Sequence, residues 1–179
     1  FQIRNTNSTR IESIESVKEI KEITNYADQK LRVYLSMGFG NPYGDEFSPE
    51  IVLDWACKLA DIGVEEFALS DTVGVSNSSN IKAIYGLLSR ELPNMDLSVH
   101  LHSGPNDWKE KIVSAYDAGC RSFDSAIKGY GGCPMAKDDL VGNLATENLI
   151  GHFSNRLPVN FNKDLFNRSL NLAEKIFSY

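Results

Sequence analysis

The feature that most restricts the fold is a repeat of a short apolar segment, a polar loop and an amphipathic helix. The apolar segments begin near residues 31, 64, 97 and 121, so the repeat recurs roughly every 30 residues. Consecutive units of this kind are typical of βα units, and the nearly continuous apolar character of the segments favours a parallel sheet covered by helices. We therefore predict an α/β fold with about four consecutive βα units, followed by helices at the carboxyl end.

Capping residues indicate where two of the helices begin. Thr9 and Glu12 have capping-box spacing at the start of a predicted helix over 9–29, and Ser48 precedes a proline at the start of a helix that ends at Gly63. The other predicted elements are strands at 31–37, 64–69, 97–101 and 121–126, and helices at 80–92, 105–118, 146–154 and 163–178. Because no linker interrupts them, we expect a single domain over residues 1–179.

Composition and charge exclude several classes of function. The 179-residue chain has a formal net charge of −6, which disfavours a nucleic-acid partner because such a surface needs clustered Lys and Arg. The apolar runs are strand-sized, so we expect no membrane segment and no signal peptide. The cysteines Cys57, Cys120 and Cys133 are odd in number and far apart, which argues against a disulfide framework and indicates a reducing, cytoplasmic compartment.

Chemically capable side chains follow the predicted strands. Asp71 follows the second strand, His100 and His102 lie at the end of the third, and Cys133 and Asn143 lie beyond the fourth. Because the carboxyl ends of parallel strands share one face of a barrel, we expect these side chains to converge on one mouth.

The two histidines are the best candidates for metal ligands. His100 and His102 are two residues apart on a predicted strand, so both imidazoles point the same way and can chelate one divalent ion. The alternative is one packed and one surface histidine, which is the commoner outcome for an isolated pair. The position at a strand end, on the side where the other polar residues gather, favours metal binding.

The other three candidates each have a structural alternative. Asn143 is either an oxygen ligand or a turn residue that opens the next helix. Asp71 is either an active-site carboxylate or a residue of a capping turn. Cys133 lies in a loop with three glycines, where a thiol can serve as nucleophile or proton donor, whereas Cys57 and Cys120 lie in elements where burial is the default.

Four motifs together resemble a known family. They are Val99–His102 (VHLH), Ser70–Gly74 (SDTVG), Gly129–Ala136 (GYGGCPMA) and Gly142–Glu147 (GNLATE). In order and spacing they are similar to the 3-hydroxy-3-methylglutaryl-CoA lyase family, within the metallolyase group of TIM barrels. The resemblance extends over about residues 5–166. The cysteine-containing glycine loop and the GNLATE segment resemble the lyases in particular, because related Claisen synthases carry a different loop.

The resemblance implies a fold, a reaction and a set of roles. The fold would be part of a TIM (βα)8 barrel, and the reaction would cleave 3-hydroxy-3-methylglutaryl-CoA to acetyl-CoA and acetoacetate, a step of leucine degradation, with Mg2+ or Mn2+ bound. His100, His102 and Asn143 match metal ligands, Asp71 matches an acid/base residue and Cys133 matches a catalytic cysteine. The protein would be cytoplasmic, or in the mitochondrial matrix of a eukaryote.

Two departures from the family pattern affect these expectations. Ser103-Gly104 stands where the family has an Asp-Thr pair, so a partner of the histidines is lost or replaced. The family's first strand supplies a metal-binding aspartate and an arginine, and its first four strands would precede this sequence. We therefore expect a fragment that is inactive alone, with open sheet edges and an uncovered apolar interior that favour a homo-oligomer. The alternatives are a related metallolyase, aldolase or Claisen-type acyltransferase, or a non-catalytic half-barrel that needs a partner chain.

Overall fold

A computed structural model describes residues 1–132, 141–154, 156–157 and 160–177 of the chain. Its sheet has three parallel strands in the order β1 (Arg32–Leu35), β2 (Glu66–Ser70) and β3 (Asp96–His100). The helices are α1 (Gln2–Thr6), α2 (Arg10–Tyr26), α3 (Pro49–Asp61), α4 (Ser78–Glu91), α5 (Trp108–Asp117), α6 (Thr146–Phe153) and α7 (Lys163–Phe177), with a 3-10 turn, η1, at Ile127–Gly129. Within the described residues, no helix is long and apolar enough to cross a membrane.

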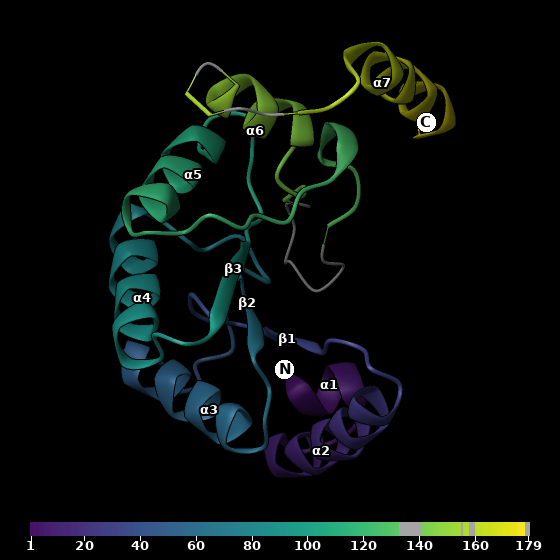
Figure 1. The fold of residues 1–179 in the computed structure, drawn as a ribbon. Helices are drawn as coiled ribbons and strands as arrows, with labels where there is room; N and C mark the ends of the chain where they lie inside the picture. The colour runs from purple at the N-terminus through teal and green to yellow at the C-terminus, as the bar shows by residue number, and fades with distance from the viewer. Residues whose placement is uncertain (133–140, 155, 158–159, 178–179) are drawn as a thin grey trace.

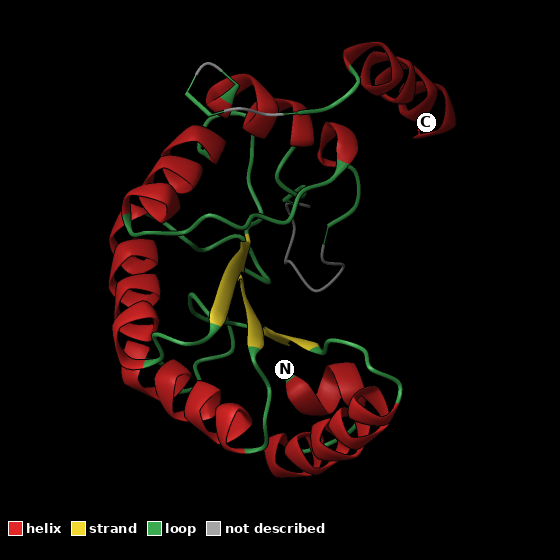
Figure 2. Cartoon of the chain, viewed as in Figure 1, coloured by secondary structure: helices red, strands yellow, loops and turns green. Residues whose placement is uncertain are grey.

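The helices that follow the strands form an arc outside the sheet. Figure 1 shows α3, α4 and α5 along one side of the strands, with none of these three helices on the opposite side. Figure 2 gives the same view by element type and shows that each strand leads through a loop into the next helix of the arc. This arrangement is a partial TIM barrel, as the sequence predicts.

Local side-chain hydrogen bonds fix the helix starts. The Thr9 side chain accepts from Glu12 N, and the Glu12 carboxylate accepts from Thr9 N, so the predicted capping box is confirmed. The Ser48 hydroxyl accepts from Ile51 N and caps α3. Helix α4 begins at Ser78, before the predicted start at 80, because the Asn77 side chain caps it and Asn80 Oδ1 accepts a hydrogen bond from Asn77 N.

The core lies between the sheet and the arc of helices. Alternate strand residues such as Phe67, Leu69 and Val99 are fully buried, and they pack with Ile84 and Leu88 of α4. A second, smaller cluster of Ile112, Leu144 and Phe153 joins α5 to α6 and to the segment that carries Asn143. The apolar faces of the sheet and the helices thus position the carboxyl ends of the strands.

The face of the sheet opposite the arc of helices carries mainly polar residues, which corrects the expectation of an uncovered apolar interior. Arg32 Nε donates to Glu66 Oε2 at 3.3 Å, and the Tyr34 hydroxyl donates to Asp124 Oδ2 at 2.7 Å. These residues alternate along the strands with the core residues, so the nearly continuous apolar reading of the strands missed one of their two faces.

The predicted fourth strand is also corrected. The segment 121–126 makes only a single parallel bridge to β3, between Phe123 and Val99. Beyond that bridge the chain turns toward the Asn143 segment, where Ala126 N donates to Leu144 O at 2.9 Å. The ladder is therefore too short to form a strand, although it still carries Asp124 to the end of β3.

We predict that Ile84→Ala lowers the free energy of unfolding by about 2–5 kcal/mol, because Ile84 is fully buried between α4 and the sheet. Urea unfolding followed by circular dichroism measures the change. The control is Ile11→Ala at a position that is 71% exposed, for which we expect a change within about 0.5 kcal/mol. Equal effects of the two substitutions would contradict the assignment of the core.

Candidate metal centre and active site

The structure brings His100, His102 and Asn143 together at the carboxyl end of the sheet. His100 is the last residue of β3, and His102 forms an antiparallel bridge with Asn143 just beyond it. The two imidazole centroids are 5.2 Å apart, with their planes at 75°. His102 and Asn143, which are far apart in the sequence, thus meet at the mouth where the sequence analysis places them.

A carboxylate orients the His100 ring. His100 Nδ1 lies 3.3 Å from Asp124 Oδ2, and the same oxygen accepts from the Tyr34 hydroxyl. This contact leaves Nε2 as the ring atom that can bind a metal, and a carboxylate on the second ring nitrogen is the usual partner of a metal-binding histidine. The sequence analysis did not single out Asp124. Side chains alternate along the predicted segment 121–126, and Asp124 follows Phe123, which packs against the core, so alternation places Asp124 on the other face.

His102 is buried and held in its neutral form. Burial is the largest cause that lowers its pKa, and the nearby charge of His100 adds to this effect. The Asp71 carboxylate and the backbone of Thr72 and Asp71 act in the opposite direction. A neutral imidazole is the form that binds a metal, so the environment of His102 suits a ligand.

Asn143 is fixed by the glycine turn at 129–132. Its Nδ2 donates to Tyr130 O at 2.9 Å, which leaves the amide oxygen to bind a ligand. Gly131 has a φ of +87°, and a Cβ there would lie 2.9 Å from Asn143 Nδ2. Glycine is therefore needed at 131 to let the backbone approach this amide.

Asp71 contacts the backbone of His100, but its carboxylate points away from the imidazoles and into the protein. Its backbone N donates to His100 O at 2.9 Å, while its carboxylate accepts from Ser76 N, the Ser76 hydroxyl and Lys111 Nζ. The residue is 1% exposed. The predicted site residue is thus in the right region, with its carboxylate turned into the protein.

Cys133 lies outside the described residues, in a stretch that begins directly after Gly132. The other two cysteines differ from each other. Cys120 is fully buried, and burial raises its pKa to about 11, which makes it unreactive near neutral pH. Cys57 is half-buried in α3.

The donor set fits a divalent metal only in part. Two ring nitrogens and one amide oxygen gather at the mouth, which are acceptable ligands. Among the residues that the structure describes, no group of three His, Cys, Asp or Glu side chains could hold a metal ion. A hard cation prefers anionic oxygen, so these three neutral groups call for a further ligand.

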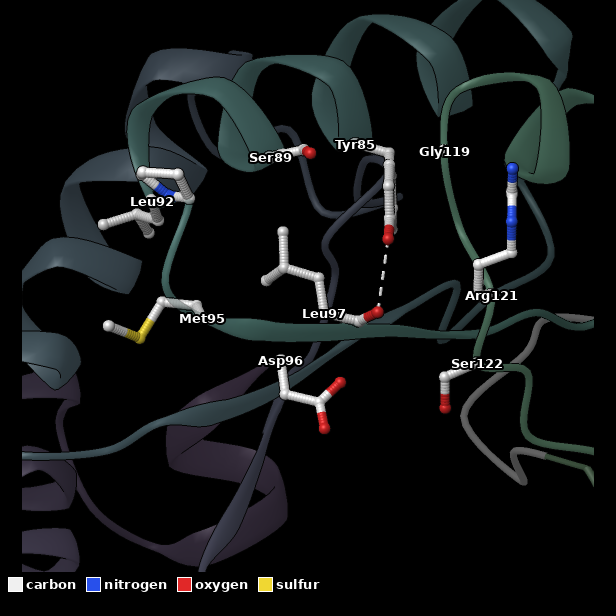
Figure 3. A pocket seen from close by; sticks show the side chains of 10 residues that line it. Tyr85, Ser89, Leu92, Met95, Asp96, Leu97, Gly119, Arg121 and Ser122 are labelled. Carbon is white, nitrogen blue, oxygen red and sulfur yellow. Dashed lines mark hydrogen bonds between the residues drawn. The ribbon is translucent and has the colours of Figure 1, made fainter.

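A hollow of about 280 Å³ lies elsewhere and is not part of this site. Its lining includes Tyr85 and Arg121, and the Tyr85 hydroxyl donates to Leu97 O at 3.2 Å (Figure 3). Asp96 and Leu97, which also line it, begin β3, whereas His100 ends it. The hollow is therefore at the opposite end of the strand from the histidines.

The fold and the site together define a class: a parallel βα-barrel protein with a histidine pair and an amide at the carboxyl ends of its strands. The family model described as HMGL-like matches residues 2–173, and the chain belongs to this family.

Relatives and solved structures support this placement. The chain is 32% identical over 166 residues to cytoplasmic 3-hydroxy-3-methylglutaryl-CoA lyase of Mus musculus, covering 93% of this chain and 48% of that protein. It is 36% identical over 133 residues to (R)-citramalyl-CoA lyase of Chloroflexus aurantiacus, covering 74% of this chain and 41% of that protein. The crystal structure of Bacillus subtilis HMG-CoA lyase superposes with a TM-score of 0.88 at 26% identity, covering 97% of this chain and 58% of that one. The chain spans about half the length of the curated relatives it matches.

We predict that NMR titration gives His102 a pKa below the unfolded value of about 6.5. Its neutral form contributes stability that is present above that value and is lost as the pH falls through the folded pKa. His100→Gln should raise this pKa by removing a like charge, and Asp71→Asn should lower it. A His102 pKa at or above 6.5 would contradict the burial that the structure gives this ring.

Proposed function

We propose that the full-length protein is a metal-dependent carbon–carbon lyase that cleaves 3-hydroxy-3-methylglutaryl-CoA to acetyl-CoA and acetoacetate. The observation that carries the proposal is the convergence of His100, His102 and Asn143 at the strand ends of an HMGL-like chain. Nε2 of His100, a ring nitrogen of His102 and the amide oxygen of Asn143 are the proposed ligands of Mg2+ or Mn2+.

The proposed chemistry follows from the substrate. A bound divalent ion would lower the pKa of the tertiary hydroxyl and help orient the substrate. Loss of the hydroxyl proton lets the adjacent carbon–carbon bond break, which leaves a ketone and a thioester enolate. The enolate carbon then takes up a proton, so the site needs a base for the first step and an acid for the last.

Cys133 and Asp71 are the proposed catalytic groups. Cys133 is the proposed proton donor to the enolate, because in the sequence it directly follows the glycine turn at 129–132, whose Tyr130 O accepts a hydrogen bond from Asn143 Nδ2. Asp71 is the proposed acid/base partner. Because its carboxylate is buried, its proton exchange would pass through the groups bonded to it, Ser76 and Lys111.

A second substrate is favoured by one observation. The (R)-citramalyl-CoA lyase of Chloroflexus aurantiacus has a higher identity to this chain, although over a shorter region. Ser103-Gly104, next to His102, replaces the Asp-Thr pair of the 3-hydroxy-3-methylglutaryl-CoA lyases, and this change is close enough to the proposed site to alter which substrate it accepts. The alternative function is therefore lyase action on a related 3-hydroxyacyl-CoA.

We also propose that residues 1–179 are one partial barrel domain that needs the rest of a barrel for activity. Strand β1 is at the edge of the three-stranded sheet, and edge strands favour pairing with another chain, for which a second copy is the simplest partner. The mass of the chain in solution tests this. The relatives include proteins named cytoplasmic and mitochondrial, and we propose the cytoplasm.

We predict that the full-length protein with Mn2+ releases acetoacetate from 3-hydroxy-3-methylglutaryl-CoA faster than it cleaves citramalyl-CoA, and that the 179-residue chain alone releases none. A coupled assay for acetoacetate and acetyl-CoA measures both. Cys133→Ala should lower turnover by about a hundredfold while Mn2+ affinity stays unchanged. The matched control is Cys57→Ala, which should leave turnover as it is. Faster cleavage of citramalyl-CoA would favour the alternative function.

A further inference from the structure

Lys111 of α5 is an ammonium buried beside the candidate metal centre. Its Nζ donates to His102 O at 2.8 Å and lies 3.3 Å from Asp71 Oδ2 and 3.1 Å from Asp107 Oδ2. The Lys111 side chain is 3% exposed and that of Asp71 is 0% exposed. One helix thus places a charge directly behind the strand end that carries the histidines.

The Asp71–Lys111 pair bonds to the backbone of both histidines. Asp71 N donates to His100 O, and Lys111 Nζ donates to His102 O. The ion pair then joins these two anchors through the Asp71 carboxylate. Ser76 fixes that carboxylate from the other side through its backbone N and its hydroxyl. The pair therefore closes a ring of contacts around the His100–His102 segment.

His102 depends on this ring more than His100 does. Strand β3 ends at His100, so the ladder with β2 no longer holds the backbone at His102. On one side His102 is held by its bridge to Asn143, and Ser103 N donates to Gly142 O at 2.9 Å. On the side of helix α5, Lys111 Nζ donates a hydrogen bond to His102 O.

General stability is a weak explanation for such a pair. Removing two charges from water is costly, and a buried ion pair is often no more stabilising than an apolar pair of the same size. Here, however, the Lys111 ammonium directs a hydrogen bond at His102 O, and the Asp71 carboxylate holds that ammonium in place while the Asp71 backbone N donates to His100 O. That geometry gives the pair a positional role that an apolar contact could not fill.

We propose that Lys111 is a positioning residue that, together with Asp71, sets the place of His102 and so controls metal affinity. The proposal rests on the proposed function, since it takes His102 as a metal ligand. It also identifies a substitute for the partner that is lost where Ser103-Gly104 replaces the family's Asp-Thr pair. Partners of this kind typically affect metal affinity by about 10- to 100-fold.

The test measures Mn2+ affinity of the full-length protein by electron paramagnetic resonance, with thermal unfolding in parallel. Lys111→Met should weaken Mn2+ binding by about 10- to 100-fold. The matched control is Lys109→Met, an exposed lysine on the same helix, which should change affinity by less than about twofold. His102→Ala is included to show that His102 is a ligand.

A double variant separates positioning from simple charge neutralisation. Lys111→Met leaves the Asp71 carboxylate buried and unpaired, which can prevent folding, whereas Lys111→Met with Asp71→Asn removes both charges. We expect the double variant to regain the melting temperature of the wild type and to keep the weak Mn2+ binding. Recovery of Mn2+ affinity in the double variant would overturn the positioning role.

The remaining outcomes distinguish the two proposals. Wild-type Mn2+ affinity in Lys111→Met, with weakened binding in His102→Ala, would overturn the role of Lys111 and leave the proposed metal site intact. Unchanged binding in His102→Ala would overturn the metal site itself, and the role of Lys111 with it.

Discussion

The parallel register between β2 and β3 is the constraint on which the site depends. Ser70 pairs with His100, so the chain leaves β2 directly beside the first histidine, and Asp71 N donates to His100 O. A shift of this register by one residue would turn His100 and His102 into the helix layer and remove Asp71 from their backbone. The buried Phe67, Leu69 and Val99 oppose such a shift, because it would expose them on the polar face. Core packing thus sets the position of the candidate metal ligands.

The two carboxylates near the histidines already bond to other side chains of the protein. Asp124 bonds to His100 and Tyr34, and Asp71 bonds to Ser76 and Lys111. Neither carboxylate is placed as a free ligand, so the cluster offers a cation two imidazoles and one amide. A hard divalent ion is bound weakly by neutral groups alone. Tight binding of such an ion would therefore need an anionic ligand in addition to these three groups.

Elements with strong local rules were predictable from the sequence. Thr9 and Glu12 form the expected capping box, Ser48 caps α3, and β1, β2 and β3 lie in the first three of the four apolar segments. The topology of a parallel barrel predicted that His100, His102 and Asn143 would converge, although Asn143 arrives through its bridge to His102 and not from the end of a fourth strand. The fourth strand was wrong because its pairing depends on where the chain turns after Asp124, which no local pattern encodes.

The misses at the site have a shared cause. Lys111 occupies a position that an amphipathic helix usually gives to an apolar residue, and a lysine in a helix is ordinarily read as exposed. Its partner Asp71 is 40 residues away in the sequence, so only the packing of α5 against the loop after β2 reveals the pair. The buried state of the Asp71 carboxylate was hidden for the same reason. Buried polar networks join residues that are far apart in the sequence, so the periodicity of apolar residues does not predict them.

We propose that His100, His102 and Asn143 bind one divalent ion at the carboxyl end of the sheet. The decisive measurement is anomalous diffraction at the manganese edge, from crystals of the full-length protein grown with Mn2+. We predict one strong peak within bonding distance of a ring nitrogen of each histidine and of the Asn143 amide oxygen. A peak bound by other residues, or no peak at saturating Mn2+, would show that these three residues are not the ligands.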